Sequence, residues 1–227
     1  MDALNPSRLG TKQHWDDVYK TELLNYAENG DEGEIWFGTQ AVDKMIKWAS
    51  EHMPASQNPL TLEIGCGNGT LLFALIEAGY DPSRLCGLDY SAGAVDLARA
   101  IAAATEENTG ISFAECDFLT EEPPHLPNLP PDAHWDLLLD KGTFDAIALA
   151  EKDEDGSAPV ARYPARVARL LKHGGLFLIT SCNFTEDELR AAFEPSGLEY
   201  HSRIQHRTIT FGGKTGSSVS SVAFKKP

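Results

Sequence analysis

Short apolar runs alternate with helical segments along most of this 227-residue chain, and this alternation restricts the possible folds more than any other feature. Runs rich in leucine, isoleucine and other apolar residues predict strands at 59–65, 84–89, 111–117, 135–140 and 176–182. Because a helical segment can connect one strand to the next parallel strand, the alternation predicts an α/β protein with a mostly parallel sheet.

The helical segments and the last part of the chain complete this prediction. Helices are expected at 11–28, 39–52, 69–79, 91–107, 164–173 and 186–194. Ser91 is expected to cap its helix, Thr185 and Glu188 form a capping-box pattern, and Gly174-Gly175 is expected to stop the helix at 164–173. Two further strand-like segments, 198–211 and 217–225, predict a hairpin at the sheet edge. The expected fold is a doubly wound, Rossmann-like, seven-stranded sheet that is mostly parallel with one antiparallel edge hairpin.

The charge balance restricts the partners. The chain carries 19 basic and 34 acidic residues, a net charge of −15. Such a chain repels phosphate backbones, so direct binding to nucleic acid is not expected, and it attracts basic partners. An equally open interpretation is that the charge serves only solubility.

Other global features predict a cytoplasmic protein without a metal. The sequence contains no run of eighteen apolar residues, so no membrane span is expected. Its polar amino end lacks the apolar stretch of a secretory signal. Cys66, Cys86, Cys116 and Cys182 show no CxxC spacing, and the seven histidines form no HxxxH pair. Reduced, mostly buried thiols are therefore expected.

A glycine-rich motif, LEIGCGNGT, lies where the first predicted strand meets the next helix. Gly65, Gly67 and Gly69 allow a tight turn and the close approach of a ligand. In open α/β sheets, ligands bind beyond the carboxyl ends of the strands. A dinucleotide fingerprint would need a third glycine where Thr70 stands, and Glu63 would repel a pyrophosphate but suits a cation.

Two acids follow the next two strands. Asp89 is expected to accept hydrogen bonds from ribose hydroxyls, and Asp117 from an adenine amino group, with Phe118 beside the ring. For Asp117, a simple cap of the strand end is the alternative. Together with Glu63, these residues suit a ligand that has an adenosine and a positive centre but no phosphate. S-adenosylmethionine is such a ligand.

The pattern E-x-G-x-G-x-G with an acid after each of the next two strands resembles class I methyltransferases from about residue 40 to residue 227. Four blocks give a narrower resemblance, to the lysine methyltransferases that modify translation elongation factor 1-alpha: residues 9–38, LEIGCGNGTLL, DKGTFDAI and SCNFTEDEL. The resemblance implies a protein-lysine N-methyltransferase whose substrate is a lysine of that basic protein.

Other functions on the same fold remain alternatives. The first is a methyltransferase that acts on another protein or on a small molecule. Thr70 and Glu63 disfavour an NAD-dependent oxidoreductase, and the intact glycines and acids disfavour a binding module without activity.

The position of each motif and the resemblance together predict a site. Residues 1–38 are expected to form an N-terminal helix and a lid, and 39–227 the methyltransferase domain. The residues expected to contact the cofactor are Trp36, Phe37, Glu63, Gly65, Cys66, Gly67, Asn68, Gly69, Asp89, Tyr90, Cys116, Asp117, Phe118 and Asp140. For Trp36 and Phe37, packing of the N-terminal helix onto the core is the alternative.

The stretch WDLLLDKGTFDAI predicts the catalytic end of the site. Asp140 is expected near the methyl group or the incoming amine, Phe144 as an apolar wall, and Asn183 as an amide oxygen that orients the amine. The alternatives are a capped strand end for Asp140 and a turn residue for Asn183. Asp145 is expected to be a helix N-terminal acid, and Lys141 to face solvent or pair with an acid.

Overall fold

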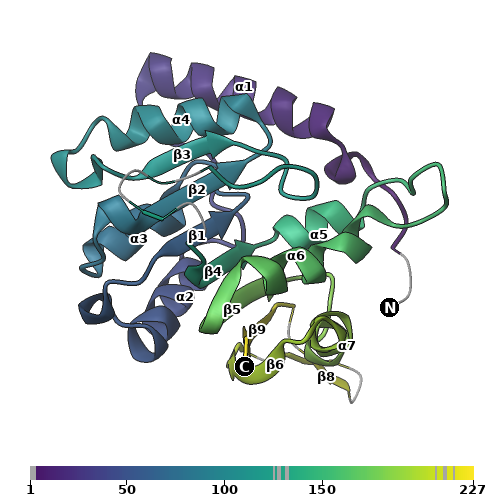
Figure 1. The fold of residues 1–227 in the computed structure, drawn as a ribbon. Coiled ribbons are helices and arrows are strands. Elements are labelled where there is room, and N and C mark those ends of the chain that lie inside the picture. The colour runs from purple at the N-terminus through teal and green to yellow at the C-terminus, as the bar shows by residue number, and fades with distance from the viewer. Residues whose placement is uncertain are drawn as a thin grey trace.

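The protein is described here from a computed structural model that covers residues 4–124, 126, 129–130, 133–207, 209–211, 214–216 and 218–227. Its centre is a seven-stranded sheet in the order β3-β2-β1-β4-β5-β9-β6 (Figure 1). The strands are β1 Thr61–Ile64, β2 Leu85–Asp89, β3 Ser112–Glu115, β4 Trp135–Lys141, β5 Leu171–Ser181, β6 Glu199–Ile204 and β9 Ser220–Lys225. A separate two-stranded sheet pairs β7 Ile209–Phe211 with β8 Lys214–Gly216.

Helices cover both faces of the large sheet (Figure 1). The α-helices are α1 Lys12–Asn29, α2 Thr39–His52, α3 Thr70–Glu77, α4 Ala92–Ala102, α5 Thr143–Ala148, α6 Tyr163–Leu170 and α7 Glu186–Phe193. The short 3-10 helices are η1 Arg8–Gly10, η2 Ala55–Gln57, η3 Pro82–Arg84, η4 Glu106–Asn108, η5 Pro159–Arg162 and η6 Glu194–Ser196. None of the helices in the described part of the chain has the length and apolar character needed to span a bilayer.

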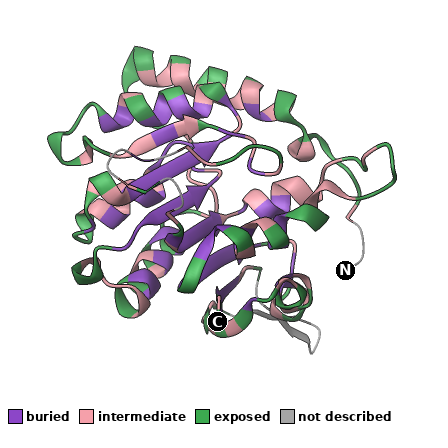
Figure 2. Ribbon diagram, viewed as in Figure 1, coloured by how far each residue is buried: buried purple, intermediate pink, exposed green. Residues whose placement is uncertain are grey.

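The core has two layers, one on each face of the sheet. Apolar side chains of α2, α3 and α4 pack on one face, and those of α5, α6 and α7 pack on the other. All four residues of β1 are buried because this strand is central and covered on both faces (Figure 2). The α1 helix lies outside this arrangement, alongside α4 (Figure 1).

The expected fold class is confirmed, including the antiparallel strands at one side of the mostly parallel sheet. The pairs β1–β2, β1–β4, β2–β3 and β4–β5 are parallel, whereas β9 is antiparallel to both β5 and β6. The strand predicted at 198–211 is divided, because β6 ends at Ile204 and β7 begins at Ile209. The edge hairpin is therefore β6 with β9, and the β7–β8 pair lies between them in the chain.

Three predicted helix ends can now be compared with the structure. The capping box of Thr185 and Glu188 is present. Ser91 occupies the N-cap position of α4, but its side chain makes no capping hydrogen bond. The predicted stop at Gly174-Gly175 is wrong: α6 ends at Leu170, and these glycines lie inside β5. Leu171 is fully buried and pairs with Trp135 of β4, so strand pairing overrides the helical periodicity there.

Candidate functional site

A cavity of about 270 Å³ lies at the carboxyl ends of β1, β2 and β4. Its walls come from the glycine-rich turn after β1, the segments that follow β2 and β3, the β4–α5 junction, α1 and residues near Trp36. The predicted cofactor residues that line it are Trp36, Gly65, Cys66, Gly67, Asn68, Asp89, Tyr90, Cys116, Asp117 and Phe118. Residues between Trp36 and Phe118 thus meet at the carboxyl ends of the strands, where open α/β sheets bind ligands.

The glycine-rich turn is held closely by its neighbours. Gly65 and Gly67 have φ angles of +69° and +53°, which L side chains rarely adopt. A Cβ atom on Gly65 would lie 1.9 Å from Oγ1 of Thr143, and one on Gly67 would lie 2.5 Å from Oη of Tyr19. Gly69 does not line the cavity; it is the N-cap of α3, where a Cβ would meet Phe73.

Asp89 connects the end of β2 to this turn. Its carboxylate accepts hydrogen bonds from the backbone N–H of Gly67 at 3.1 Å and of Ser91 at 2.9 Å. Burial raises the pKa of Asp89 to about 6, although both hydrogen bonds act in the opposite direction. Asp89 lines the cavity, and a carboxylate can accept about four hydrogen bonds, so it retains capacity for a ligand diol.

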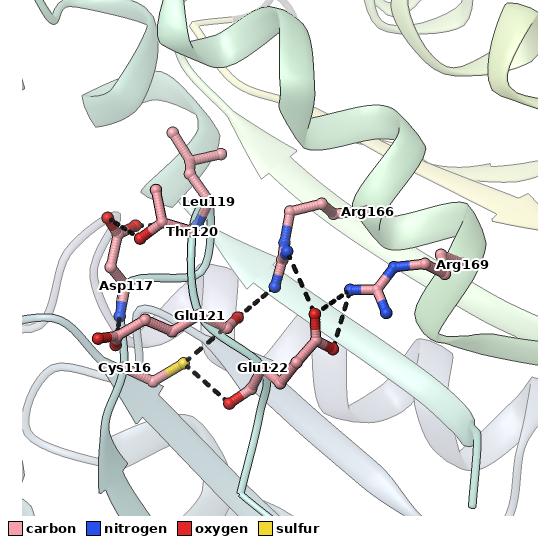
Figure 3. A network of polar contacts seen from close by, with 8 residues as sticks. All are labelled: Cys116, Asp117, Leu119, Thr120, Glu121, Glu122, Arg166 and Arg169. Atoms are coloured by element: carbon pink, nitrogen blue, oxygen red, sulfur yellow. Dashed lines mark hydrogen bonds and ion pairs between the residues drawn. The ribbon is translucent and has the colours of Figure 1, made fainter. Parts of the chain in front are cut away.

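Asp117 caps the turn after β3 and also lines the cavity. Its carboxylate accepts from the Leu119 N–H at 2.9 Å and from the Thr120 hydroxyl at 2.8 Å, so it does cap the turn after β3 (Figure 3). It also lines the cavity, next to Phe118. The two hydrogen bonds of the cap fix the orientation of this carboxylate at the wall of the cavity.

The chain after Asp117 is tied to α6. The Cys116 thiol lies 3.9 Å and 3.7 Å from the carbonyl oxygens of Glu121 and Glu122 (Figure 3). Arg166 donates to the Glu121 carbonyl, and Arg169 donates to the Glu122 carboxylate at 2.8 Å. These contacts hold the chain at residues 121–122 against α6, next to the cavity wall formed by residues 116–119.

Glu63 lies behind the glycine-rich turn and does not line the cavity. It is 1% exposed, and neither carboxylate oxygen has a hydrogen-bond partner among the described residues. Burial raises its pKa to about 8, and the positive charge of Lys141 opposes this shift. A buried carboxylate without a partner is costly, so the site favours a ligand that brings a positive charge.

Asp140, which the sequence predicts to contact the cofactor or the amine, is not among the residues that line this cavity. It is fully buried and accepts hydrogen bonds from the N–H groups of Thr143 at 2.8 Å and Phe144 at 3.0 Å, and from the Tyr163 hydroxyl at 2.5 Å. Burial raises its pKa to about 7. Asp140 therefore holds the β4–α5 turn, as the alternative of a capped strand end had suggested.

Phe144 and Asn183 also lie outside the cavity wall. Phe144 is buried in the α5–α7 layer, where its ring contacts Tyr163 and Phe184. The N–H of Asn183 donates to the Ser181 hydroxyl, which matches the alternative of a turn residue.

Asp145 and Phe37 are placed by their contacts with neighbouring elements. Asp145 lies in the first turn of α5, as expected, and also accepts from the N–H of Cys182 at 2.7 Å. Phe37 lies against Gly142, where a Cβ would be 2.6 Å from its ring, but it does not line the cavity.

Sequence reasoning missed several residues of the wall. Trp15 and Tyr19 reach the cavity from α1, and Glu34 reaches it from the loop after that helix. The rings of Trp15 and Trp36 lie 4.9 Å apart between centroids. The aromatic residues Trp15, Tyr19 and Tyr26 recur at helical spacing in the helix predicted at 11–28. This periodicity alone could not show that one face of the helix covers a ligand site.

The β4–α5 junction and η5 also contribute charged residues to the wall. Lys141 lines the cavity near Glu63, and Arg162 lines it from η5. In the part of the chain that the structure describes, no group of three or more histidine, cysteine, aspartate or glutamate residues could hold a metal ion.

Comparisons with known proteins agree with this geometry. Residues 56–222 match the family described as "Methyltransferase domain". The chain is 39% identical over 236 residues to "Protein-lysine N-methyltransferase efm4" of Schizosaccharomyces pombe. This alignment covers 99% of this chain and 97% of that protein. It is 37% identical over 230 residues to "EEF1A lysine methyltransferase 2" of Homo sapiens, which covers 99% of this chain and 89% of that protein.

A solved structure supports the fold. Magnesium protoporphyrin IX methyltransferase from Synechocystis PCC 6803, with bound SAM, superposes with a TM-score of 0.58 at 15% identity and covers 93% of this chain and 98% of that chain.

Proposed function

The chain belongs to the methyltransferase-domain family and, within it, to the protein-lysine N-methyltransferases that include efm4 and EEF1A lysine methyltransferase 2, and we propose that its substrate is a lysine of translation elongation factor 1-alpha. The methyl donor is S-adenosylmethionine. One observation carries the assignment of the site: a single cavity joins the glycine-rich turn, Asp89 and Asp117 at the sheet edge. Glu63 lies behind this turn and has no hydrogen-bond partner among the described residues.

The residues of the cavity fit this cofactor part by part. Asp89 accepts hydrogen bonds from the ribose diol, and Asp117 with Phe118 holds the adenine. The absence of side chains at Gly65 and Gly67 leaves room for Thr143 and Tyr19, which line the cavity beside this turn. Glu63 places a carboxyl group behind this turn, and a positive charge brought by a ligand favours its ionised form. When bound, the cofactor supplies a methyl group that its sulfonium charge already activates.

The remaining wall supplies what an acceptor lysine needs. An unperturbed lysine has a pKa of about 10.4, so the amine must lose a proton before it can react. Partial desolvation in a cavity favours this loss. The faces of Trp15 and Trp36 attract an ammonium group, and Glu34 adds a carboxylate beside them. We therefore place the acceptor amine along this wall and not at Asp140, Phe144 or Asn183. Asp140 acts instead as a positioning residue for Gly142 and Thr143, which do line the cavity.

The proposed reaction is tested by incubating the purified protein with labelled S-adenosylmethionine and purified elongation factor 1-alpha. The expected result is labelling of one lysine, located by peptide mass spectrometry and lost when that lysine is replaced by arginine. Labelling of a small molecule, or of other proteins in preference to the factor, would reject the proposed substrate.

The enzyme carries a net charge of −15, so salt should screen its attraction to this basic acceptor. The value of kcat/KM for the acceptor should therefore fall as ionic strength rises.

Asp89→Asn should weaken cofactor binding by about 1–3 kcal/mol, because an ionised acceptor is lost. The pKa of about 6 adds a pH dependence. As the pH falls through 6, Asp89 takes up a proton and becomes a poorer acceptor, so the affinity of the wild type should decrease between pH 7 and pH 5. The affinity of Asp89→Asn should change little over this range. Calorimetry at several pH values tests this, and parallel pH curves for the two proteins would contradict the role of Asp89.

A further inference from the structure

Lys141, the last residue of β4, is a charged residue of the cavity wall to which the proposed reaction gives no role. Successive side chains of a strand point to opposite faces, so Lys141 lies on the same face as Leu139 and opposite to Asp140. Its ammonium makes no direct hydrogen bond or ion pair with any described residue, although Glu63 and Asp140 are near enough to act on it electrostatically. Burial lowers its pKa.

Glu63 is the natural counter-charge of Lys141. In the parallel pairing of β1 with β4, Glu63 is opposite Leu139 and Ile64 is opposite Asp140, so Glu63 and Lys141 share one face of the sheet. Both oxygens of Glu63 are buried, and neither has a hydrogen-bond partner among the described residues. Two groups that favour each other's charged forms thus lie near each other without a direct contact between them. Each is costly to bury unless further polar groups complete its environment.

The order of the strands shows which part of the cofactor reaches these charges. Asp117 follows β3, Asp89 ends β2, the glycine-rich turn follows β1 and Lys141 ends β4, and these four strands are neighbours in this order. Adjacent strands are about 4.8 Å apart, so the row spans roughly 14 Å. With adenine at β3 and ribose at β2, the amino-acid end of an extended cofactor lies at β1 and β4.

We propose that the Lys141 ammonium binds the carboxylate of the cofactor's amino-acid end and that Glu63 is a positioning residue that holds Lys141 through its charge. This inference rests on the proposed function, because it assumes S-adenosylmethionine as the ligand. It identifies Lys141 as the residue that distinguishes a cofactor with an intact amino acid from one without the carboxylate.

Other cations near the cavity are already committed to carboxylates of the protein. Arg162 lines the cavity, but its guanidinium lies 3.0 Å from a carboxylate oxygen of Asp153. Lys12 lies 2.9 Å from Asp16 and over the ring of Tyr90, at the β2 side of the site. Lys141 is the cation at the β4 side, where the carboxylate is expected.

The test is a comparison of ligands by calorimetry. S-adenosylmethionine and S-adenosylhomocysteine carry the carboxylate, decarboxylated S-adenosylmethionine lacks it, and 5′-methylthioadenosine lacks the whole amino-acid end. Lys141→Met should weaken the first two by at least about tenfold. It should leave 5′-methylthioadenosine unchanged and leave decarboxylated S-adenosylmethionine unchanged or strengthened, because a nearby positive charge is removed. Lys47→Met, at an exposed position of α2, is the matched control and should change none of the four.

Glu63→Gln tests the positioning role. It should weaken the two carboxylate-bearing ligands in the wild-type background but cause little further loss in Lys141→Met, because its effect passes through that lysine. Binding of 5′-methylthioadenosine to each variant reports that the adenosine site is intact.

Two outcomes overturn the inference: equal losses for all four ligands, or no loss for S-adenosylmethionine in Lys141→Met. Loss of turnover with all affinities kept would assign Lys141 to the acceptor amine instead. Failure of the wild-type protein to bind any of the four ligands would reject the proposed function itself.

Discussion

Gly65→Ala is expected to abolish measurable cofactor binding, whereas Gly174→Ala should leave it unchanged. The two glycines have similar backbone conformations, with φ angles of +69° and +81°. Alanine at either position therefore carries a comparable conformational cost of about 1–2 kcal/mol. The surroundings differ: a Cβ on Gly65 would lie 1.9 Å from Thr143 Oγ1, while a Cβ on Gly174 would have nothing within 4 Å.

The steric conflict at Gly65 cannot be relieved by a small side-chain movement. Thr143 Oγ1 donates a hydrogen bond to the Ile64 carbonyl at 2.7 Å, which fixes the threonine between β1 and α5. The glycine-rich turn must then move, and this displaces the backbone that approaches the ligand. Calorimetry with S-adenosylhomocysteine on both variants, with thermal unfolding as a check of the fold, measures the difference. In the double variant, Thr143→Ala should restore part of the affinity because it removes the closest atom. Equal losses in Gly65→Ala and Gly174→Ala would show that backbone strain, and not the contact with Thr143, is responsible.

The architecture was accessible from the sequence because burial leaves a simple pattern. All residues of β1 and the Leu137–Leu139 stretch of β4 are buried by helices on both faces, and continuous apolar runs result. The glycine-rich turn was also accessible, since positive φ angles select glycine. The end of α6 was not, because the pairing of Leu171 with β4 is a long-range interaction that no local pattern records.

The polar side of the site was harder to predict for a geometric reason. Asp140 and Lys141 are adjacent, and in a strand adjacent side chains point to opposite faces. The sequence shows two charged residues at the end of β4 but not which one turns toward the ligand. The partner that decides this, Tyr163, is 23 positions further along the chain. The contribution of Trp15 and Tyr19 to the cavity wall depends on how α1 packs alongside α4, which the helical spacing of these residues does not specify.

Asp140→Ala is expected to lower the free energy of unfolding by at least about 3 kcal/mol. The carboxylate accepts from the N–H groups of Thr143 and Phe144 and from the Tyr163 hydroxyl, and its loss leaves three buried donors without an acceptor. Each such donor costs about 1–3 kcal/mol. Tyr163→Phe removes one donor together with its bond, so its loss should be smaller, about 1 kcal/mol. The matched control is Asp155→Ala: Asp155 accepts from the N–H and hydroxyl of Ser157 in an exposed turn, and its removal should have little effect.

The pH dependence of this loss follows from the pKa of Asp140, which burial raises to about 7 from an ordinary value of 3.8. The folded state then holds the proton more tightly than the unfolded state, so the contribution of Asp140 to stability is fully present below about pH 4 and decreases as the pH rises toward 7. The difference between wild type and Asp140→Ala should therefore be larger at pH 5 than at pH 8. Urea denaturation of both proteins at the two pH values measures it. If stability and turnover fall together, and Tyr163→Phe shows the same pattern in weaker form, Asp140 acts by holding the β4–α5 turn. If Asp140→Ala instead unfolds like the wild type but loses turnover, the carboxylate acts on the reacting groups.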